Sequence, residues 1–144
     1  MPDIHIKYFK ICGLLVCLFL FDSCQNATEK DSNLLNRDKQ SLAELNRVNQ
    51  IISSGQLITQ NEVDSVQKIR EKYPSAPVVR QILQSALIRR EDWQTAADLI
   101  SQIPELQRTD EEKNNLAKIY LKLGRYEDVL RIVNPLLEKN PADI

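Results

Sequence analysis

The residues of this sequence that could support catalysis or metal binding are a single histidine and three acidic pairs. The histidine, His5, precedes an apolar run near the N-terminus, so the rest of the chain has no imidazole for acid–base or metal chemistry. The acidic pairs are Glu91-Asp92, Glu111-Glu112 and Glu127-Asp128. Each pair stands where we expect a helix to begin, and carboxylates at that position stabilise the helix dipole. We therefore predict no enzyme, no cofactor and no metal site, and a carboxylate-pair hydrolase such as a glycosidase is a remote alternative.

The segment 1–24 has the pattern of an export signal. Lys7 and Lys10 make the start basic, and an unbroken apolar run follows over residues 11–21. A helix of that length spans roughly 16 Å, about half of a ~30 Å hydrocarbon core. The length is typical of the apolar region of a signal peptide rather than of a transmembrane helix.

The apolar run is followed by Ser23-Cys24, and the whole segment resembles a bacterial lipoprotein signal. The resemblance implies that residues 1–23 are removed, and that Cys24 becomes the first mature residue and carries acyl chains such as palmitate. Because Gln25 rather than an aspartate follows, it also implies an outer-membrane location facing the periplasm. An ordinary signal peptide or an uncleaved anchor is the alternative. Cys12 and Cys17 lie inside the apolar run, so Cys24 would have no partner for an internal disulfide in the mature chain.

The composition indicates a globular domain that does not bind nucleic acid. Lys and Arg number 19 against 20 Asp and Glu in 144 residues, which leaves no basic excess for phosphate binding. With only 3 glycines and short β-branched runs, the sequence argues against a β-sandwich or a glycine-rich nucleotide-binding sheet. The polar stretch 25–33 lacks helical periodicity, so we expect residues 24–37 to hold the lipidated cysteine and a flexible linker. The folded domain then covers residues 38–144.

Residues 38–144 contain an internal repeat with a period of 33–34. Trp93 and Tyr126 are separated by one such period, and each precedes an amphipathic stretch. Glu71–Pro74 and Glu138–Pro141 share the pattern Glu-Lys-x-Pro and are separated by twice the period. Such a period, built from two short helices, resembles the tetratricopeptide repeat (TPR), most closely in Leu116–Pro141. The resemblance implies a short α-solenoid of about three helix-turn-helix repeats, in which Trp93 and Tyr126 seal equivalent helix pairs.

Apolar spacing and helix-start signals predict where the helices lie. We expect helices at 38–53, 60–72, 76–89, 92–102, 110–122 and 126–139. Three Ser/Thr-x-x-Glu patterns predict capping boxes, in which a hydroxyl and a carboxylate satisfy free N–H groups of the first turn. These patterns are Ser41–Glu44, Thr59–Glu62 and Thr109–Glu112, and Ser75 before Pro77 predicts a further N-cap.

The resemblance to TPR domains also implies a place for a protein or peptide partner. Such domains hold a partner in a groove lined by the first helix of each repeat. The matching positions here are Gln81, Ser85, Arg89, Asn114, Lys118 and Lys122. The alternative is that these polar side chains are solvated helix faces. The TPR carboxylate clamp needs basic residues at the positions held here by Leu45, Glu111 and Asn115, so the resemblance does not imply specificity for a C-terminal peptide.

A second candidate surface is the outer side of the last helix. TPR arrays usually end in an extra helix that covers the final repeat, and here the printed sequence stops where that helix would begin. We expect part of an apolar stripe formed by Leu130, Val133, Leu137 and their neighbours to be exposed, and this edge to dock a partner helix or a second copy of the chain; a shortened reading frame is the alternative. The sequence thus predicts a lipid-anchored scaffold or adaptor. Its rival is a structural subunit that homo-oligomerises or completes a membrane complex.

Overall fold

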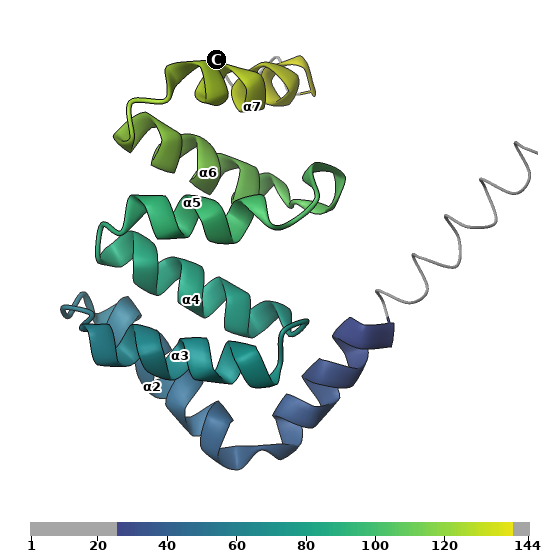
Figure 1. The fold of residues 1–144 in the computed structure, drawn as a ribbon, viewed down its shortest axis with the longest axis vertical. Coiled ribbons are helices and arrows are strands. Elements are labelled where there is room, and N and C mark those ends of the chain that lie inside the picture. Colours follow the sequence, from purple (N-terminus) through teal and green to yellow (C-terminus); the bar gives the residue numbers. More distant parts are fainter. Residues whose placement is uncertain (1–25, 140–144) are drawn as a thin grey trace, which may run out of the picture.

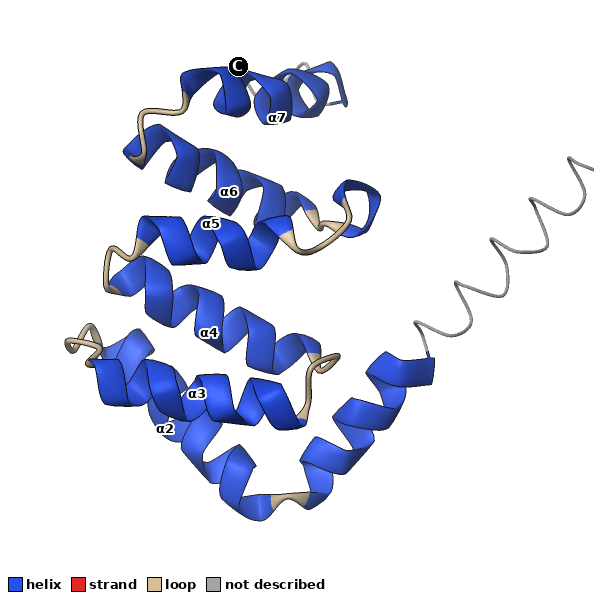
Figure 2. Ribbon diagram, viewed as in Figure 1, coloured by secondary structure: helices blue, strands red, loops and turns tan. Residues whose placement is uncertain are grey.

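The computed structural model describes residues 26–139, and every regular element in that range is helical (Figures 1 and 2). Residues 26–37 form a first helical segment. The helices that follow are α2 (Lys39–Ser54), α3 (Gln60–Lys72), α4 (Pro77–Arg89), α5 (Trp93–Ser101), α6 (Asp110–Lys122) and α7 (Tyr126–Lys139), with a short 3-10 turn, η1 (Glu105–Gln107), before α6. All six expected helices are confirmed to within one residue at each end. The predicted signal peptide, Cys24 and Pro141 lie outside the described residues.

The helices alternate in direction and stack as three pairs, α2/α3, α4/α5 and α6/α7 (Figure 1). Each pair packs on the next through α3 against α4 and α5 against α6. One core runs through the stack and includes the buried side chains of Leu45, Val66, Leu83, Ile100 and Leu116. The predicted fold class, an all-α solenoid of about three helix-turn-helix units, is confirmed. Within residues 26–139, no helix combines the length and the apolarity needed to cross a bilayer.

The turns that end α4 and α6 have the same backbone conformation. Gly124 has a φ of 72°, and Glu91, at the equivalent position one repeat earlier, has a φ of 61°. The Glu91 N–H donates to the Ile88 carbonyl at 3.0 Å, and the Gly124 N–H donates to the Leu121 carbonyl at 3.2 Å. The internal repeat therefore extends to the backbone of the turns, although the middle unit has a glutamate where the last has a glycine.

Two of the three predicted capping boxes are confirmed. At the start of α6, the Thr109 N–H donates to the Glu112 carboxylate at 2.9 Å, and the Glu112 N–H donates to the Thr109 hydroxyl oxygen at 3.1 Å. At the start of α3, the Thr59 N–H donates to the Glu62 carboxylate at 2.9 Å in the same arrangement. Each glutamate thus satisfies an N–H group that the helix itself leaves unpaired.

The predicted caps at Ser41 and Ser75 are wrong. Ser41 lies inside α2, because the Asp38 carboxylate caps this helix and accepts from both the Ser41 N–H, at 3.1 Å, and the Ser41 hydroxyl, at 2.8 Å. An ionised carboxylate is a stronger acceptor than a hydroxyl, so it takes the capping position ahead of Ser41. The N-cap of α4 is Ala76 rather than Ser75, and the Ser75 N–H is used in a contact with the first helical segment.

The flexible linker predicted up to residue 37 is also wrong for residues 26–37, which form a helix packed against the domain. Leu35 on this segment is buried in the core. The Asp31 carboxylate accepts a hydrogen bond from the Ser75 N–H at 2.8 Å. Contacts of this kind join positions that are distant in the chain, so local polarity could not reveal them.

Asp38 joins the first helical segment to the rest of the stack. Besides capping α2, its carboxylate accepts hydrogen bonds from the Lys72 ammonium at 2.6 Å and from the Tyr73 hydroxyl at 2.9 Å. The hydrogen bonds from Lys72 and then from Ser41 hold the pKa of the Asp38 carboxyl well below its usual range. The pKa of Lys72 is raised by the same contact. The Asp38 carboxylate therefore links the junction between residues 26–37 and α2 to the C-terminal end of α3.

Candidate protein-binding surfaces

The exposed face of α4 carries three of the predicted binding residues. Gln81, Ser85 and Arg89 recur at every fourth position along α4, and all three are exposed. Because residues four apart share one face of a helix, they form a continuous polar stripe. The other faces of α4 bury side chains such as Val79 and Leu83 against α2, α3 and α5.

The exposed face of α6 carries the next three. Asn114, Lys118 and Lys122 also recur at every fourth position and are exposed, whereas Leu116 and Ile119 are buried on the opposite side. These six polar residues therefore occupy the same place on the first helices of the second and third pairs. Their exposure makes both stripes accessible to a partner.

Two of the six residues already have contacts within the protein. The Arg89 guanidinium donates to the Ile52 carbonyl at the end of α2, at 2.7 Å. The Lys122 ammonium lies 6.0 Å from the centroid of the Trp93 ring, within the range of a cation–π contact. These two cations connect neighbouring pairs of helices. The residues that remain available to a partner are therefore Gln81 and Ser85 on α4, and Asn114 and Lys118 on α6.

A salt bridge fixes the spacing of α4 and α6 near this stripe. The Arg80 guanidinium and the Glu112 carboxylate are 3.1 Å apart, and Glu112 is buried. Glu112 is also the residue that caps α6 through Thr109. The pair joins α4 to α6 directly, so it helps to fix the distance between the two stripes. Removing either partner would leave an uncompensated charge and destabilise this contact.

The outer side of α7 exposes apolar side chains, as the sequence predicted. Leu130 is 59% exposed and Leu137 is 40% exposed. None of the described α7 side chains is buried. Ala97 and Ile100 of α5, which match Leu130 and Val133 one repeat later, are buried in the core that α6 completes. Leu130 thus lies on the side where, in α5, the next helix packs.

Tyr126 does not repeat the role of Trp93. Trp93 is partly buried against the core, whereas Tyr126 is 65% exposed. The prediction that both aromatic rings seal equivalent helix pairs is therefore wrong for Tyr126. The cause is the same as for Leu130: Trp93 lies beside Lys122 of the following pair, and no described helix follows α7.

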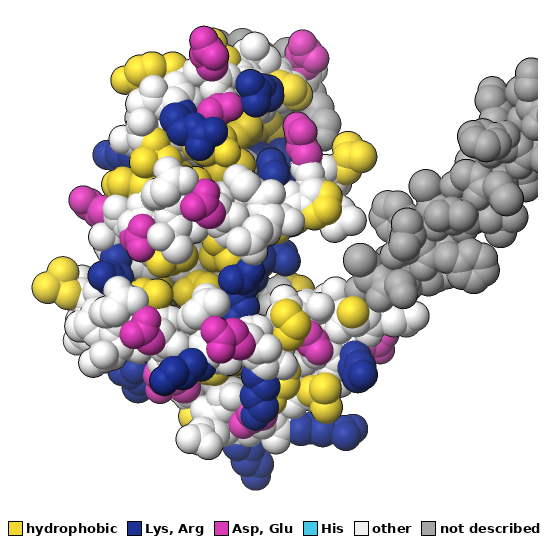
Figure 3. Space-filling model, in the orientation of Figure 1, with side chains coloured by type: hydrophobic (Ala, Val, Ile, Leu, Met, Phe, Trp, Pro, Cys, Tyr) yellow, Lys and Arg dark blue, Asp and Glu magenta, His cyan; other side chains and the backbone are white. Residues whose placement is uncertain are grey.

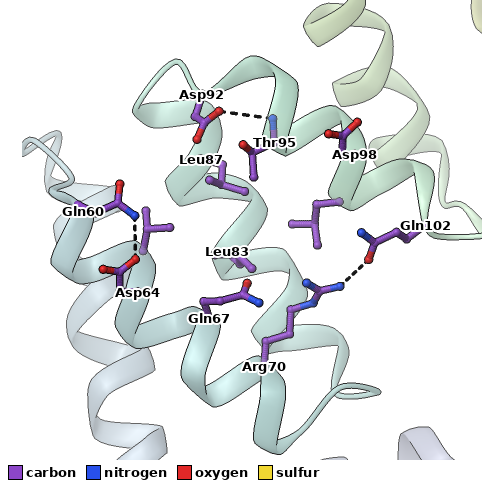
Figure 4. A pocket seen from close by; sticks show the side chains of 12 residues that line it. Gln60, Asp64, Gln67, Arg70, Leu83, Leu87, Asp92, Thr95, Asp98 and Gln102 are labelled. Atoms are coloured by element: carbon purple, nitrogen blue, oxygen red, sulfur yellow. Dashed lines mark hydrogen bonds between the residues drawn. The ribbon is translucent and has the colours of Figure 1, made fainter.

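A cavity of about 340 Å³ lies between α3 and α5, and no sequence pattern predicted it (Figure 4). Leu83 and Leu87 of α4 contribute to its apolar floor, and its rim is polar. At one end Arg70 of α3 donates to the side-chain carbonyl of Gln102 of α5 at 2.6 Å. The cavity exists only because two helices from different pairs stand side by side, so no local pattern marks it.

No protein-family model, no curated protein and no solved structure matches this chain. Among residues 26–139, no group of three or more His, Cys, Asp or Glu side chains is placed to hold a metal ion. On the face drawn in Figure 3, acidic and basic side chains are interspersed over the helices. The polar stripes of α4 and α6 and the apolar side of α7 are therefore the surfaces from which a function can be argued.

Proposed function

We propose that this chain is a non-catalytic protein–protein interaction module of the bacterial cell envelope, anchored to the outer membrane by acylation of Cys24 and facing the periplasm. We further propose that its helix pairs are TPR-type repeats. The left-handed turns at Glu91 and Gly124, which stand at equivalent positions of successive units, support this assignment. So does the stacking of one helix pair on the next.

The observation that carries the proposal is the exposed apolar side of α7, formed by Tyr126, Leu130 and Leu137. Soluble proteins seldom leave several large apolar side chains exposed along one helix unless they contact a partner. On α5 the positions equivalent to Tyr126 and Leu130 are Trp93, which is partly buried, and Ala97, which is buried, and the amphipathic helix α6 packs on α5. The partner that best fits the side of α7 is accordingly an amphipathic helix of another protein.

The binding proposal is tested by placing a photo-crosslinking residue at Leu130 in cells, with Leu57 as the matched control. Leu57 is 91% exposed in the turn between α2 and α3, away from α7. We expect a discrete crosslinked protein from position 130 and none from position 57. If the folded protein gives no adduct at 130, the α7 surface is not the binding site, and the stripe around Gln81 and Asn114 becomes the better candidate.

The alternative is a structural subunit that homo-oligomerises through the same side of α7. It is favoured by the fact that one apolar surface can pack against its own copy around a two-fold axis. An adduct with twice the mass of the chain, together with a dimer mass in solution, would support this alternative. Leu130→Lys should then produce monomers, whereas Leu57→Lys should leave the dimer intact.

The anchor is tested separately. The intact mass of the mature protein should exceed that of residues 24–144 by the mass of the acyl groups. Cys24→Ser should leave the protein unprocessed or release it from membranes. An unmodified mature chain that starts at another residue would exclude the lipoprotein assignment.

A further inference from the structure

A second cavity, of about 310 Å³, lies on the side of the domain where the first helical segment joins the stack. It lies among side chains of α3, α4 and α5, the start of segment 26–37, the turn between α3 and α4, and the turn around η1. Figure 1 shows these two turns on the same side of the stack as segment 26–37. The described lining residues are Ala27, Thr28, Arg70, Pro74, Ser75, Arg80, Leu99, Gln102, Ile103, Pro104 and Gln107.

Two arginines line this cavity, and the carboxylates of Asp31 and Glu105 belong to the segments that surround it. Arg70 and Arg80 are the ionisable side chains among its described lining residues, and both are cations. Arg70 donates to the neutral amide of Gln102 rather than to a carboxylate. Arg80 uses one terminal nitrogen for Glu112, and its Nε is buried with no hydrogen-bond partner among the described residues. Because the charge of Arg80 is compensated by Glu112, Arg70 is the lining cation that an anionic group can use.

The rim of the cavity carries a fully exposed leucine. Leu106 lies in η1, between the lining residues Pro104 and Gln107, and its side chain is 100% exposed. An arginine such as Arg70 near an exposed apolar side chain is suited to a membrane surface, where lipid phosphates lie directly above the apolar acyl region.

The position of the anchor brings this surface to the membrane. Ala27 follows Cys24 closely in the chain, and the few peptide units between them span at most about 11 Å when fully extended. The segment beginning at residue 26 is held to the domain by Leu35 and by the bond from Ser75 to Asp31, so it cannot act as a long tether. An acylated Cys24 would therefore hold the cavity and Leu106 close to the lipid head groups.

We propose that this cavity and Leu106 form a membrane-docking surface, in which Arg70 contacts a lipid phosphate and Leu106 enters the acyl boundary. The inference rests on the proposed anchor at Cys24. It adds that the domain lies against the bilayer in one orientation, with the turn between α2 and α3, on the opposite side of the stack in Figure 1, directed away from it.

The orientation is tested with the acylated mature chain in vesicles of phosphatidylethanolamine and phosphatidylglycerol. An environment-sensitive dye is attached to Leu106→Cys or, as the matched control, to Leu57→Cys. Both leucines are almost fully exposed in turns, on opposite sides of the stack. With Cys24 acylated, the introduced cysteine is the only free thiol of the mature chain. We expect the emission at position 106 to shift to shorter wavelength and to be quenched by brominated lipid, and the emission at 57 to match that in water.

Flotation of the vesicles distinguishes failure of the anchor from failure of the docking. If the protein does not float with the vesicles, both the anchor and the docking surface are excluded. If it floats but the dye at 106 stays in water, the anchor stands and the docking surface is wrong. Equal quenching at 106 and 57 would mean that the domain has no fixed orientation, which also overturns the inference.

A second variant tests the cationic contact without disturbing a buried pair. Arg70→Gln removes one charge from the cavity, and Arg131→Gln removes an exposed charge from α7 as a control. We expect Arg70→Gln to lower the equilibrium constant for docking by about fivefold, the usual effect of one basic residue near an anionic surface. Arg131→Gln should leave it unchanged. Equal behaviour of the two variants would exclude phosphate contact by Arg70.

Discussion

The turn at Glu91 provides a direct test of the repeat. Glu91 has a φ of 61°, and this left-handed conformation costs an L-residue about 1–2 kcal/mol. Glycine avoids that cost but loses roughly 0.4–1 kcal/mol more than other residues through its greater freedom in the unfolded chain. Because the Glu91 side chain is exposed, its loss removes little packing. We expect Glu91→Gly to raise the free energy of unfolding by about 0.5–1 kcal/mol, and the Tm by about 2–5 °C.

Two controls separate the backbone from the side chain, with urea unfolding followed by circular dichroism as the assay. Glu91→Ala removes the same side chain but keeps the left-handed cost, so its stability should stay within about 0.5 kcal/mol of the parent. Gly124→Ala should lower stability by about 0.5–1 kcal/mol, since a Cβ there meets no other described atom within 4 Å and the cost is conformational. If Glu91→Gly is no more stable than Glu91→Ala, the left-handed turn at residue 91 is refuted.

The other predictions concern packing and pH. Trp93→Ala should lower the free energy of unfolding by about 3 kcal/mol, because the ring packs on the core; thermal unfolding measures this. Leu35→Ala should release residues 26–37 and increase their amide hydrogen exchange, since Leu35 is the buried side chain of that segment. The lowered pKa of Asp38 means that its carboxylate stabilises the fold above the ordinary value of 3.8, and that this stability is lost as the pH falls below it. Asp38→Asn should therefore flatten the loss of stability between pH 5 and pH 3, measured by denaturant unfolding at each pH.

The helices could be predicted because each carries its own signals along the chain. In α6, Leu116 and Ile119 recur at helical spacing on the buried face, and Thr109 with Glu112 marks the start. These interactions join residues three or four positions apart, so they are present in the sequence whatever the rest of the chain does. The stacking of the pairs followed from the period of the repeat.

The packing of residues 26–38 on the domain could not be predicted, because the contacts that hold it join residues distant in the chain. The Ser41–Glu44 pattern matches a capping box, but the Asp38 carboxylate caps α2 instead. Asp38 gains its partner Lys72 from the end of α3, and such a contact has no local signature. The polar composition of 25–33 predicts a linker, whereas Asp31 and Leu35 contact the domain.

The candidate surfaces divide in the same way. The stripe from Gln81 to Arg89 and the exposure of Leu130 could be read from helical spacing and from the end of the repeat. The two cavities could not, because each requires helices from different pairs to stand at a particular separation. Arg70 illustrates the point: it lines both cavities and bonds to Gln102, which is 32 positions away, and nothing near Arg70 in the sequence distinguishes it from a solvated arginine.

The docked entry segment changes what the proposed anchor does for binding. A flexible linker would let the domain present any surface to any direction, so an anchor would raise only the local concentration. With residues 26–37 packed on the domain, the proposed docking would place the side of the stack that carries η1 against the bilayer. The axis of the stack (Figure 1) would then run along the membrane rather than away from it. The apolar side of α7, at the end of the stack, would then point along the membrane surface rather than away from it. Its partner helix would have to approach within the layer next to the membrane, which favours a second membrane-anchored protein over one that diffuses freely in the periplasm.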